Sequence, residues 1–445
     1  MQTLLQKYWY RLRSSLWFVP TIMTCLAVAM ALSAVALDRT VTNDWLQILG
    51  LSYSGGAEGA SLLLGTVAGS MIAIAGTVFS MTLVALSLAS SQLGPRLLRN
   101  FMRDTANQVV LGTFVATFLY CLIVLRTIRR ADEVAFVPHL SISIGVLLAI
   151  VSVGVLIYFI HHISVSIQAD QVVARVGQEL DDGIDRLFPD NLGDSGPEAS
   201  RAPDEACLPA QFAREGYTVG ALQDGYIQMI DADALMALAS KEDLLLRLER
   251  RPGHYLAKGR AMVMVWPKDR VTETLAGKLN ASFVLGNQRS AVQDMEFSLQ
   301  QLVEIALRAL SPGINDPFTA VACVDRLESA LCSLARREMP SPYRFDGHGQ
   351  LRLVATGATF AGIVDTAFNQ IRQSARSNPA VAIRMLDAIA QIAGHVNSAQ
   401  QATCLQRHAD MIVKGAREAV PEADDVLAVE VHFTEAMLAL RIFGS

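Results

Sequence analysis

Six hydroxyl side chains recur along one apolar segment of this 445-residue sequence, at a spacing that places them on one side of a helix. Alternating steps of four and three residues, counted from Thr66, meet serine or threonine everywhere except at Ala73 and Val84. Residues three or four positions apart share a helix face. This hydroxyl stripe consists of Thr66, Ser70, Thr77, Ser80, Ser87 and Ser91.

Uncharged hydroxyls on a membrane helix are compatible with two roles. They can form hydrogen bonds across a closely packed helix interface, and the neighbouring pair Gly65 and Gly69 favours such packing because small residues let helix backbones approach. They can instead line a weakly selective polar path through an oligomer. The residues alone leave both roles open.

A basic elbow, defined as residues 92–101, follows the hydroxyl stripe. Gly94-Pro95 breaks the helix soon after Gln92. The stretch that follows contains Arg96 and Arg99 among apolar residues, a pattern that favours the inner membrane surface. The basic elbow is either a gating element that couples the C-terminal half to the stripe or a plain connecting loop.

Two adjacent histidines, His161 and His162, end another apolar segment. Neighbouring helical residues point about 100° apart, so the two rings cannot chelate one ion without further ligands. They either cap a helix end at the membrane interface or sense pH or an ion.

A polar loop between two prolines is the third candidate site. Asn315 and Asp316 lie between Pro312 and Pro317, and Ser311 precedes them. These residue types suit a tight connection between two helices, with Asp316 as an N-cap, or a contact between subunits. They are equally able to bind a small ligand or cation.

The elements that position these residues fall into two halves. Residues 1–165 carry a net charge of +4, whereas the remaining residues carry a net charge of −9. Hydrophobic residues make up 52% of the chain, and the mean hydropathy is +0.33, which is too apolar for an ordinary soluble protein. We therefore expect a membrane half followed by an acidic soluble half.

Four uncharged stretches reach the length needed to cross a hydrocarbon core of about 30 Å as helices. No acidic or basic residue lies in the middle of any of them, which disfavours an ion-coupled transporter. The first is longer than a typical signal-peptide core, so we expect an uncleaved anchor. The stretches are 16–37, 61–90, 109–125 and 140–160.

Basic residues near these stretches predict the orientation. Six lie at the N-terminus and after the second stretch, against four on the opposite side. Because basic residues favour the cytoplasmic side, we expect a multi-pass protein of the bacterial inner membrane with both termini in the cytoplasm. The six cysteines contain no CxxC pair and predict neither a disulfide framework nor a zinc site.

We expect five parts along the chain. A four-helix transmembrane domain (1–163) precedes a stalk helix (164–189) and a flexible linker (190–210). A small β-rich domain (211–290) then leads to a cytoplasmic helical domain (291–445). The fold class is thus a membrane helix bundle followed by an α+β region.

The β-rich part is predicted to be a small barrel or sandwich, because short strands alternate with tight turns. Asp224-Gly225 predicts a hairpin between strands at 217–222 and 226–230, and three further strands are expected at 244–249, 254–257 and 261–266. Residues 252–259, read as PGHYLAKG, are similar to barrel-sandwich modules of the biotinyl/lipoyl type, although no hairpin for a modified lysine is present. The sequence shows no internal repeat or low-complexity tract that would make a solenoid.

Motifs for common chemistries are missing from the sequence. It contains no P-loop, HExxH or GxSxG motif, so enzymatic activity is disfavoured and we expect no cofactor, no metal and no catalytic residues. Nucleic acid is an unsuitable partner because the soluble half is net negative. The expected partners are the lipid bilayer and further copies of the chain.

Residues 308–317, read as RALSPGINDP, resemble the hallmark of the bacterial predicted membrane protein family named domain of unknown function 2254. The segments 79–86, 91–96 and 160–163 support this resemblance. It covers almost the whole chain and implies four spans and a cytoplasmic domain, with no established activity.

Taken together, the sequence favours a homo-oligomer whose second span lines a channel-like or transport-like polar path, with the cytoplasmic domain as regulator. The alternative is a membrane-anchored sensor or scaffold that binds a ligand or partner without conduction. Under that alternative, the hydroxyl stripe only packs helices.

Overall fold

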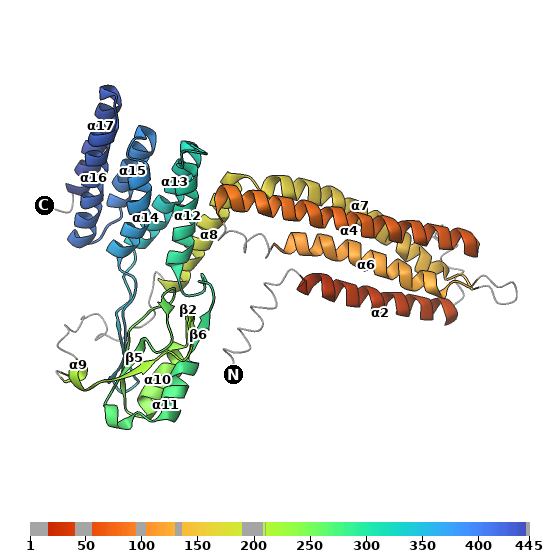
Figure 1. Ribbon diagram of the computed structural model, residues 1–445, viewed down its shortest axis with the longest axis horizontal. Coiled ribbons are helices and arrows are strands. Elements are labelled where there is room, and N and C mark those ends of the chain that lie inside the picture. Colours follow the sequence, from red (N-terminus) through yellow and green to blue (C-terminus); the bar gives the residue numbers. More distant parts are fainter. Residues whose placement is uncertain are drawn as a thin grey trace. The chain divides into compact units, whose positions relative to one another are not determined.

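The computed structural model describes residues 17–40, 56–94, 104–129, 136–188, 208–209 and 211–441. The chain divides into two compact units, residues 1–171 and 172–445 (Figure 1). The linker predicted at 190–210 lies outside the described residues, apart from Leu208 and Pro209.

Four long apolar helices make up the described part of the first unit. Each is long and apolar enough to cross a membrane, which confirms the prediction of four candidate spans. The second of them has 37 residues and is therefore about 55 Å long. The helices are α2 (Phe18–Thr40), α4 (Ala57–Leu93), α6 (Thr105–Thr127) and α7 (His139–Ser166).

Helix α6 is the centre of this bundle, because it packs against the other three helices and is the most buried of the four. Its side chains Phe114 and Tyr120 are fully buried. Gly112 allows α2 to approach closely, since a Cβ atom there would lie 2.6 Å from the Met23 sulfur. The Tyr120 hydroxyl donates a hydrogen bond to the Ser141 carbonyl of α7 at 2.9 Å.

Asp38, near the C-terminal end of α2, caps the N-terminus of α7. Its carboxylate accepts hydrogen bonds from the backbone N–H groups of Leu140 and Ser141, each at 2.9 Å, and from the Ser141 hydroxyl at 2.6 Å. The N-cap residue of α7 is Pro138, whose side chain makes no capping hydrogen bond. A carboxylate from another helix therefore satisfies the first N–H groups of α7.

In the described part of the second unit, eight strands form two open sheets. One has the order β1-β5-β3-β8-β7 and the other the order β4-β2-β6. All neighbouring strands are antiparallel except β3 and β8. The strands are β1 (Tyr217–Gly220), β2 (Gly225–Ile230), β3 (Leu245–Leu248), β4 (Tyr255–Leu256), β5 (Ala261–Trp266), β6 (Phe283–Gly286), β7 (Tyr343–Phe345) and β8 (Leu351–Ala355).

The five strands predicted between 217 and 266 are present, but their arrangement differs from the prediction. No closed barrel forms in the described residues, so the predicted barrel or sandwich is unconfirmed. The predicted hairpin at Asp224-Gly225 is wrong, since β1 pairs with β5 while β2 pairs with β4 and β6. The Asp224 carboxylate instead accepts a hydrogen bond from Lys258 N, which draws this turn toward the β4–β5 connection.

Helices α10 (Ala232–Lys241) and α11 (Glu273–Ala281) complete this part and were not predicted. Both helices contribute to one core that the two sheets share. Strands β1 and β2 belong to different sheets, and each buries apolar side chains in this common core from its own sheet. Two shorter elements are α9 (Phe212–Glu215) and the 3₁₀ turn η3 (Lys268–Arg270). Central core residues are Val219, Ile227, Leu235, Leu246, Val263, Leu279 and Leu353.

The helical part is a stack of three helical hairpins, although the sequence shows no repeat. Figure 1 shows α12 to α17 side by side, and α13, α15 and α17 pack against one another in that order. Asp316-Pro317 and Asn378-Pro379 begin the second helix of the first two hairpins in the same way. The hairpins are α12/α13 (Met295–Ala309, Pro317–Ala335), α14/α15 (Phe360–Ser374, Pro379–Ala393) and α16/α17 (Ala399–Ala419, Ala423–Leu440).

Helix α8 (Ala169–Leu187) is a separate helix, because α7 ends at Ser166. The Arg337 guanidinium, near the end of α13, donates a hydrogen bond to the Phe188 carbonyl just after α8 at 2.8 Å. Arg186 of α8 donates another to the Ala291 carbonyl at 3.0 Å. The segment predicted as a stalk is therefore attached to the helical stack.

Candidate functional site

Every residue of the hydroxyl stripe is exposed in the described bundle. The opposite face of α4 is buried and rich in alanine, which allows the close packing of α4 on the bundle. The stripe therefore lies outside the buried face by which α4 packs in the described first unit. The buried face comprises Ala60, Leu64, Ala68, Met71, Ala75, Val78, Ala85 and Ala89.

The stripe is long enough to cross a bilayer. From Thr66 to Ser91 the helix advances about 38 Å, whereas a hydrocarbon core is about 30 Å thick. Several hydroxyls donate hydrogen bonds to carbonyls of their own helix: Thr66 to Leu62 at 2.8 Å and Thr77 to Ala73 at 3.2 Å. These bonds satisfy the hydroxyl donors without a second helix. The lone pairs of the hydroxyl oxygens stay accessible from outside α4.

Glycines near the stripe leave space beside the exposed face of α4. A Cβ atom added at Gly65, Gly69 or Gly76 would meet no described atom within 4 Å. A shallow hollow of about 470 Å³ is lined by α4 alone and includes Gly65 and Thr66. This face therefore has room for the backbone of another helix or for water.

The basic elbow is only partly described. Gln92 lies near the end of α4, and the helix stops at Gly94, whose φ of 124° suits glycine. Arg96 and Arg99 lie outside the described residues, so the predicted elbow stays a prediction.

The two histidines have different surroundings. His161 is exposed, whereas the His162 Nε2 atom lies 2.8 Å from an Asp104 carboxylate oxygen. Asp104 is the N-cap of α6 and also accepts a hydrogen bond from Ala106 N at 3.0 Å. His162 thus connects the end of α7 to the start of α6, and Asp104 is the partner that sequence reasoning missed.

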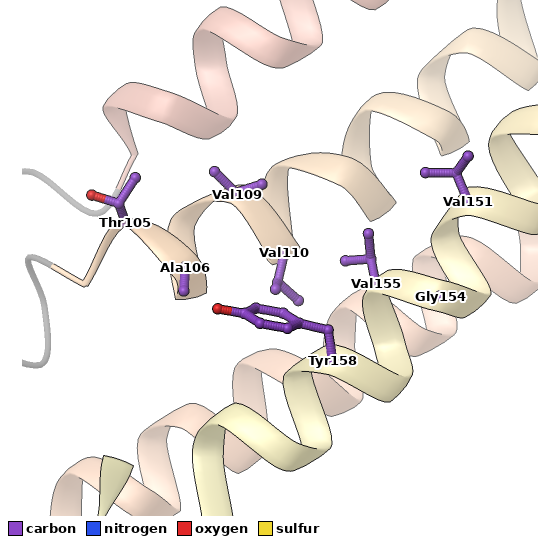
Figure 2. A pocket seen from close by; sticks show the side chains of 8 residues that line it. All are labelled: Thr105, Ala106, Val109, Val110, Val151, Gly154, Val155 and Tyr158. Atoms are coloured by element: carbon purple, nitrogen blue, oxygen red, sulfur yellow. The ribbon is translucent and has the colours of Figure 1, made fainter. Parts of the chain in front are cut away.

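A groove of about 520 Å³ lies between α6 and α7 beside this pair (Figure 2). The Tyr158 ring, which lines the groove, stacks on His162 with ring centroids 5.5 Å apart. Apart from the Thr105 and Tyr158 hydroxyls, its side chains are apolar and suit a hydrocarbon chain better than a polar solute. The lining residues are Thr105, Ala106, Val109, Val110, Val151, Gly154, Val155 and Tyr158.

The predicted membrane protein family DUF2254 matches residues 13–391. The chain belongs to this family. Uncharacterized proteins of Mycobacterium bovis and Mycobacterium tuberculosis are each 31% identical to it over 438 residues, which cover 96% of this chain and 81% of the relative. No solved structure matches the chain.

In this DUF2254 protein, the polar loop 311–316 connects α12 to α13. The Ser311 hydroxyl donates a hydrogen bond to the Arg308 carbonyl at 2.6 Å. Asp316 is the N-cap of α13 and accepts hydrogen bonds from the N–H and hydroxyl groups of Thr319 at 3.2 and 2.5 Å. Ser311 and Asp316 therefore both stabilise the turn.

The remaining loop residues are open to solvent. Asn315 is exposed and has a φ of 49°, a left-handed conformation that asparagine tolerates better than most residues. Ile314 and Phe318 beside it are 45% and 82% exposed. An exposed apolar pair next to a polar turn favours a contact with a protein over a cation site.

A buried ionic network that the sequence did not reveal links the sheets to the stack. Arg289 donates to both carboxylate oxygens of Asp294, at 2.8 and 3.0 Å, and to Gln300 at 2.5 Å. Burial raises the pKa of the Asp294 carboxyl, and Arg289 opposes that rise. Arg251 and Glu296 form a neighbouring ion pair at 2.8 Å. In the sequence, the one indication of this network is that Arg289 and Asp294 are only five residues apart.

The cysteines of the DUF2254 helical stack lack the properties of nucleophiles. Burial raises the pKa of the Cys323 and Cys404 thiols, and it raises the pKa of Cys332 to about 11. These three thiols therefore stay protonated near pH 7.

His408 on α16 is fully buried and predicts a pH-dependent stability. Its Nε2 atom lies 2.8 Å from Asp365, while its Nδ1 atom has no hydrogen-bond partner among the described residues. Burial is the main cause of a lowered His408 pKa, although Asp365 partly opposes it. The folded state thus favours the neutral ring, whereas the unfolded ring takes up a proton below about pH 6.5.

The second unit is therefore expected to lose stability as the pH falls below about 6.5 toward the lowered pKa of His408. His408→Gln keeps a donor for Asp365 and does not titrate, so its stability should fall less over the same range. Urea unfolding at several pH values between 7.5 and 5, with alkylation of the buried Cys323 as the readout, measures the stability of both proteins. Equal pH slopes in both proteins would contradict the prediction.

Proposed function

We propose that this protein forms a homo-oligomer in the bacterial inner membrane, in which the hydroxyl stripe of α4 lines a polar path. The observation that carries the proposal is the exposure of all six stripe residues on a helix whose other face is packed. Some of these hydroxyls already donate to carbonyls of their own helix, but water or another copy of α4 can also donate to their oxygen atoms, which lipid chains cannot do. An oligomer places this face in such surroundings.

The chemistry of the stripe sets the kind of path. It carries six hydroxyls and no charge, so it would favour weakly selective passage of small polar species over selection by charge. The hollow at Gly65 and Thr66 supports close approach of a neighbouring helix.

We further propose that the second unit regulates this path from the cytoplasm. The excess of basic residues beside the N-terminus and in the basic elbow supports that orientation. In this arrangement Arg96 and Arg99 lie at the inner membrane surface, where a change in the second unit could act on the end of α4.

A membrane-anchored scaffold or sensor is the second candidate. The stack of three helical hairpins favours it, because stacked helical hairpins commonly provide extended surfaces for partner proteins. The exposed side chains of Ile314 and Phe318 at one hairpin turn are suitable contacts for such a partner.

Conductance of the purified protein in planar bilayers tests the polar path. Thr77→Leu and Ser80→Leu place apolar bulk on the stripe and are expected to abolish conductance while the oligomer survives. Ile72→Phe adds bulk at an exposed apolar position outside the stripe and is the matched control. It should conduct as the native chain does.

Two outcomes would overturn this proposal. A silent, monomeric native protein would exclude an oligomeric path. The other outcome is a native protein that forms an oligomer but does not conduct, together with stripe variants that no longer form the oligomer. That result would assign the stripe to helix packing and favour the scaffold. Chemical crosslinking in native membranes gives the oligomeric state independently of conductance.

A further inference from the structure

Three side chains of metal-ligand type meet on the last two hairpins of the stack. Asp387 belongs to α15, and His432 and Glu435 belong to α17. The His432 Nδ1 atom lies 2.6 Å from an Asp387 oxygen and 3.6 Å from a Glu435 oxygen. One ligand atom from each residue lies within 4.8 Å of the others.

Regular secondary structure holds the three groups in place. His432 and Glu435 are three residues apart on one helix, so they share a face, and a separation of three also occurs in the Glu-x-x-His ligand pairs of helical metal proteins. Asp387 comes from α15, which packs closely along α17. No loop has to reorganise to bring these atoms together.

We propose that Asp387, His432 and Glu435 bind a divalent transition-metal ion, with Zn²⁺ as the best-fitting ion. Tetrahedral Zn²⁺ with bonds of about 2.0–2.1 Å separates its ligand atoms by about 3.4 Å. The observed separations of 2.6 and 3.6 Å lie on either side of that value. Because all three ligand atoms lie within 4.8 Å of one another, side-chain adjustments of about 1 Å would complete the site.

The charge of the cluster distinguishes it from an ordinary ion pair. His408 and Asp365 also pair on this stack, but there Arg407 binds the same carboxylate and supplies a cation. At His432 the third group is instead a second carboxylate. Within the described residues, Asp387 and Glu435 form ion pairs with His432 alone, so two carboxylates share one imidazole. A bound cation would neutralise this excess negative charge.

Exposure and ligand chemistry narrow the choice of ion. His432 is 32% exposed and Glu435 is 61% exposed, which leaves an entry path and room for a water as fourth ligand. The imidazole favours Zn²⁺ and related transition metals over Mg²⁺ and Ca²⁺, which prefer oxygen ligands. An ion here would join α17 to α15 and so stabilise the last hairpin.

Isothermal titration of the full chain in detergent, prepared without a polyhistidine tag and stripped with EDTA, tests the proposal with ZnCl₂. We expect one site per chain that His432→Gln and Glu435→Gln each weaken at least about 100-fold. Glu435→Gln leaves the His432–Asp387 pair intact and therefore guards against a folding defect. Glu430→Gln removes a carboxylate from the same helix, where it pairs with Arg417, and should bind as the native chain does.

Substitution by Co²⁺ separates this site from the cysteines, because thiolate ligands add charge-transfer absorption that imidazole and carboxylate ligands lack. We expect a Co²⁺ spectrum without thiolate bands that disappears in His432→Gln. Absence of binding, equal affinity in native and His432→Gln proteins, or a thiolate spectrum would each overturn the proposal. The cluster would then be an ion pair only.

Discussion

Asp38→Ala is expected to destabilise the membrane-spanning bundle by about 2–4 kcal/mol, because it removes a charged cap from the start of α7. The Asp38 carboxylate accepts two backbone N–H groups and the Ser141 hydroxyl. Ser141 is fully buried, and its carbonyl accepts the hydrogen bond of Tyr120. Loss of the cap therefore also loosens the contact between α6 and α7.

Thermal unfolding in detergent micelles, read by alkylation of the buried Cys121, measures this effect. Asp38→Asn keeps one acceptor oxygen and should lose less than half as much stability as Asp38→Ala. Thr40→Val is the matched control, since within the described part of the chain the Thr40 hydroxyl donates only to carbonyls of its own helix. If Asp38→Ala were as stable as Thr40→Val, water would cap α7 equally well.

Asp294→Ala is expected to destabilise the second unit by about 3–5 kcal/mol, because it leaves the largely buried Arg289 guanidinium without its carboxylate. Asp294→Asn preserves the shape and one acceptor, so its effect should be smaller. Urea unfolding followed by circular dichroism gives both values. A loss below about 1 kcal/mol would show that solvent replaces the carboxylate.

Two glycines provide an independent test of the same network. Gly253 and Gly259 have φ angles of 89° and 83°, so alanine costs about 1–2 kcal/mol of backbone strain at either position. At Gly253 a Cβ atom would also lie 2.2 Å from an Asp294 oxygen, whereas at Gly259 it would meet nothing. Gly253→Ala should therefore cost about 1–3 kcal/mol more than Gly259→Ala.

Several elements could be predicted because their signals are local. A long apolar run needs no distant partner to be recognised as a span, and the strands at 226–230 and 261–266 were found from short apolar runs between turns. The cap at Asp316-Pro317 also follows from adjacent residues. The sheet order could not be predicted in this way, since β3 pairs with β8 about 100 residues further along the chain.

The candidate sites show the same division. The spacing of the hydroxyl stripe could be recognised in the sequence. Which face of α4 is buried in the bundle could not be predicted from it. His162 was visible, whereas Asp104 lies 58 residues away and was missed. Asp387 is likewise separated from His432 by 45 residues, and no motif joins them.

The sequence by itself determined four apolar spans, the six-hydroxyl spacing of the second span, and the family of the chain through the run at 308–317. The tertiary structure alone decided that the stripe is exposed and that alanines occupy the packed face. The physical reason is that helix periodicity is set by neighbours along the chain, whereas burial depends on which distant surfaces meet. The open face of α4 is the result of that packing.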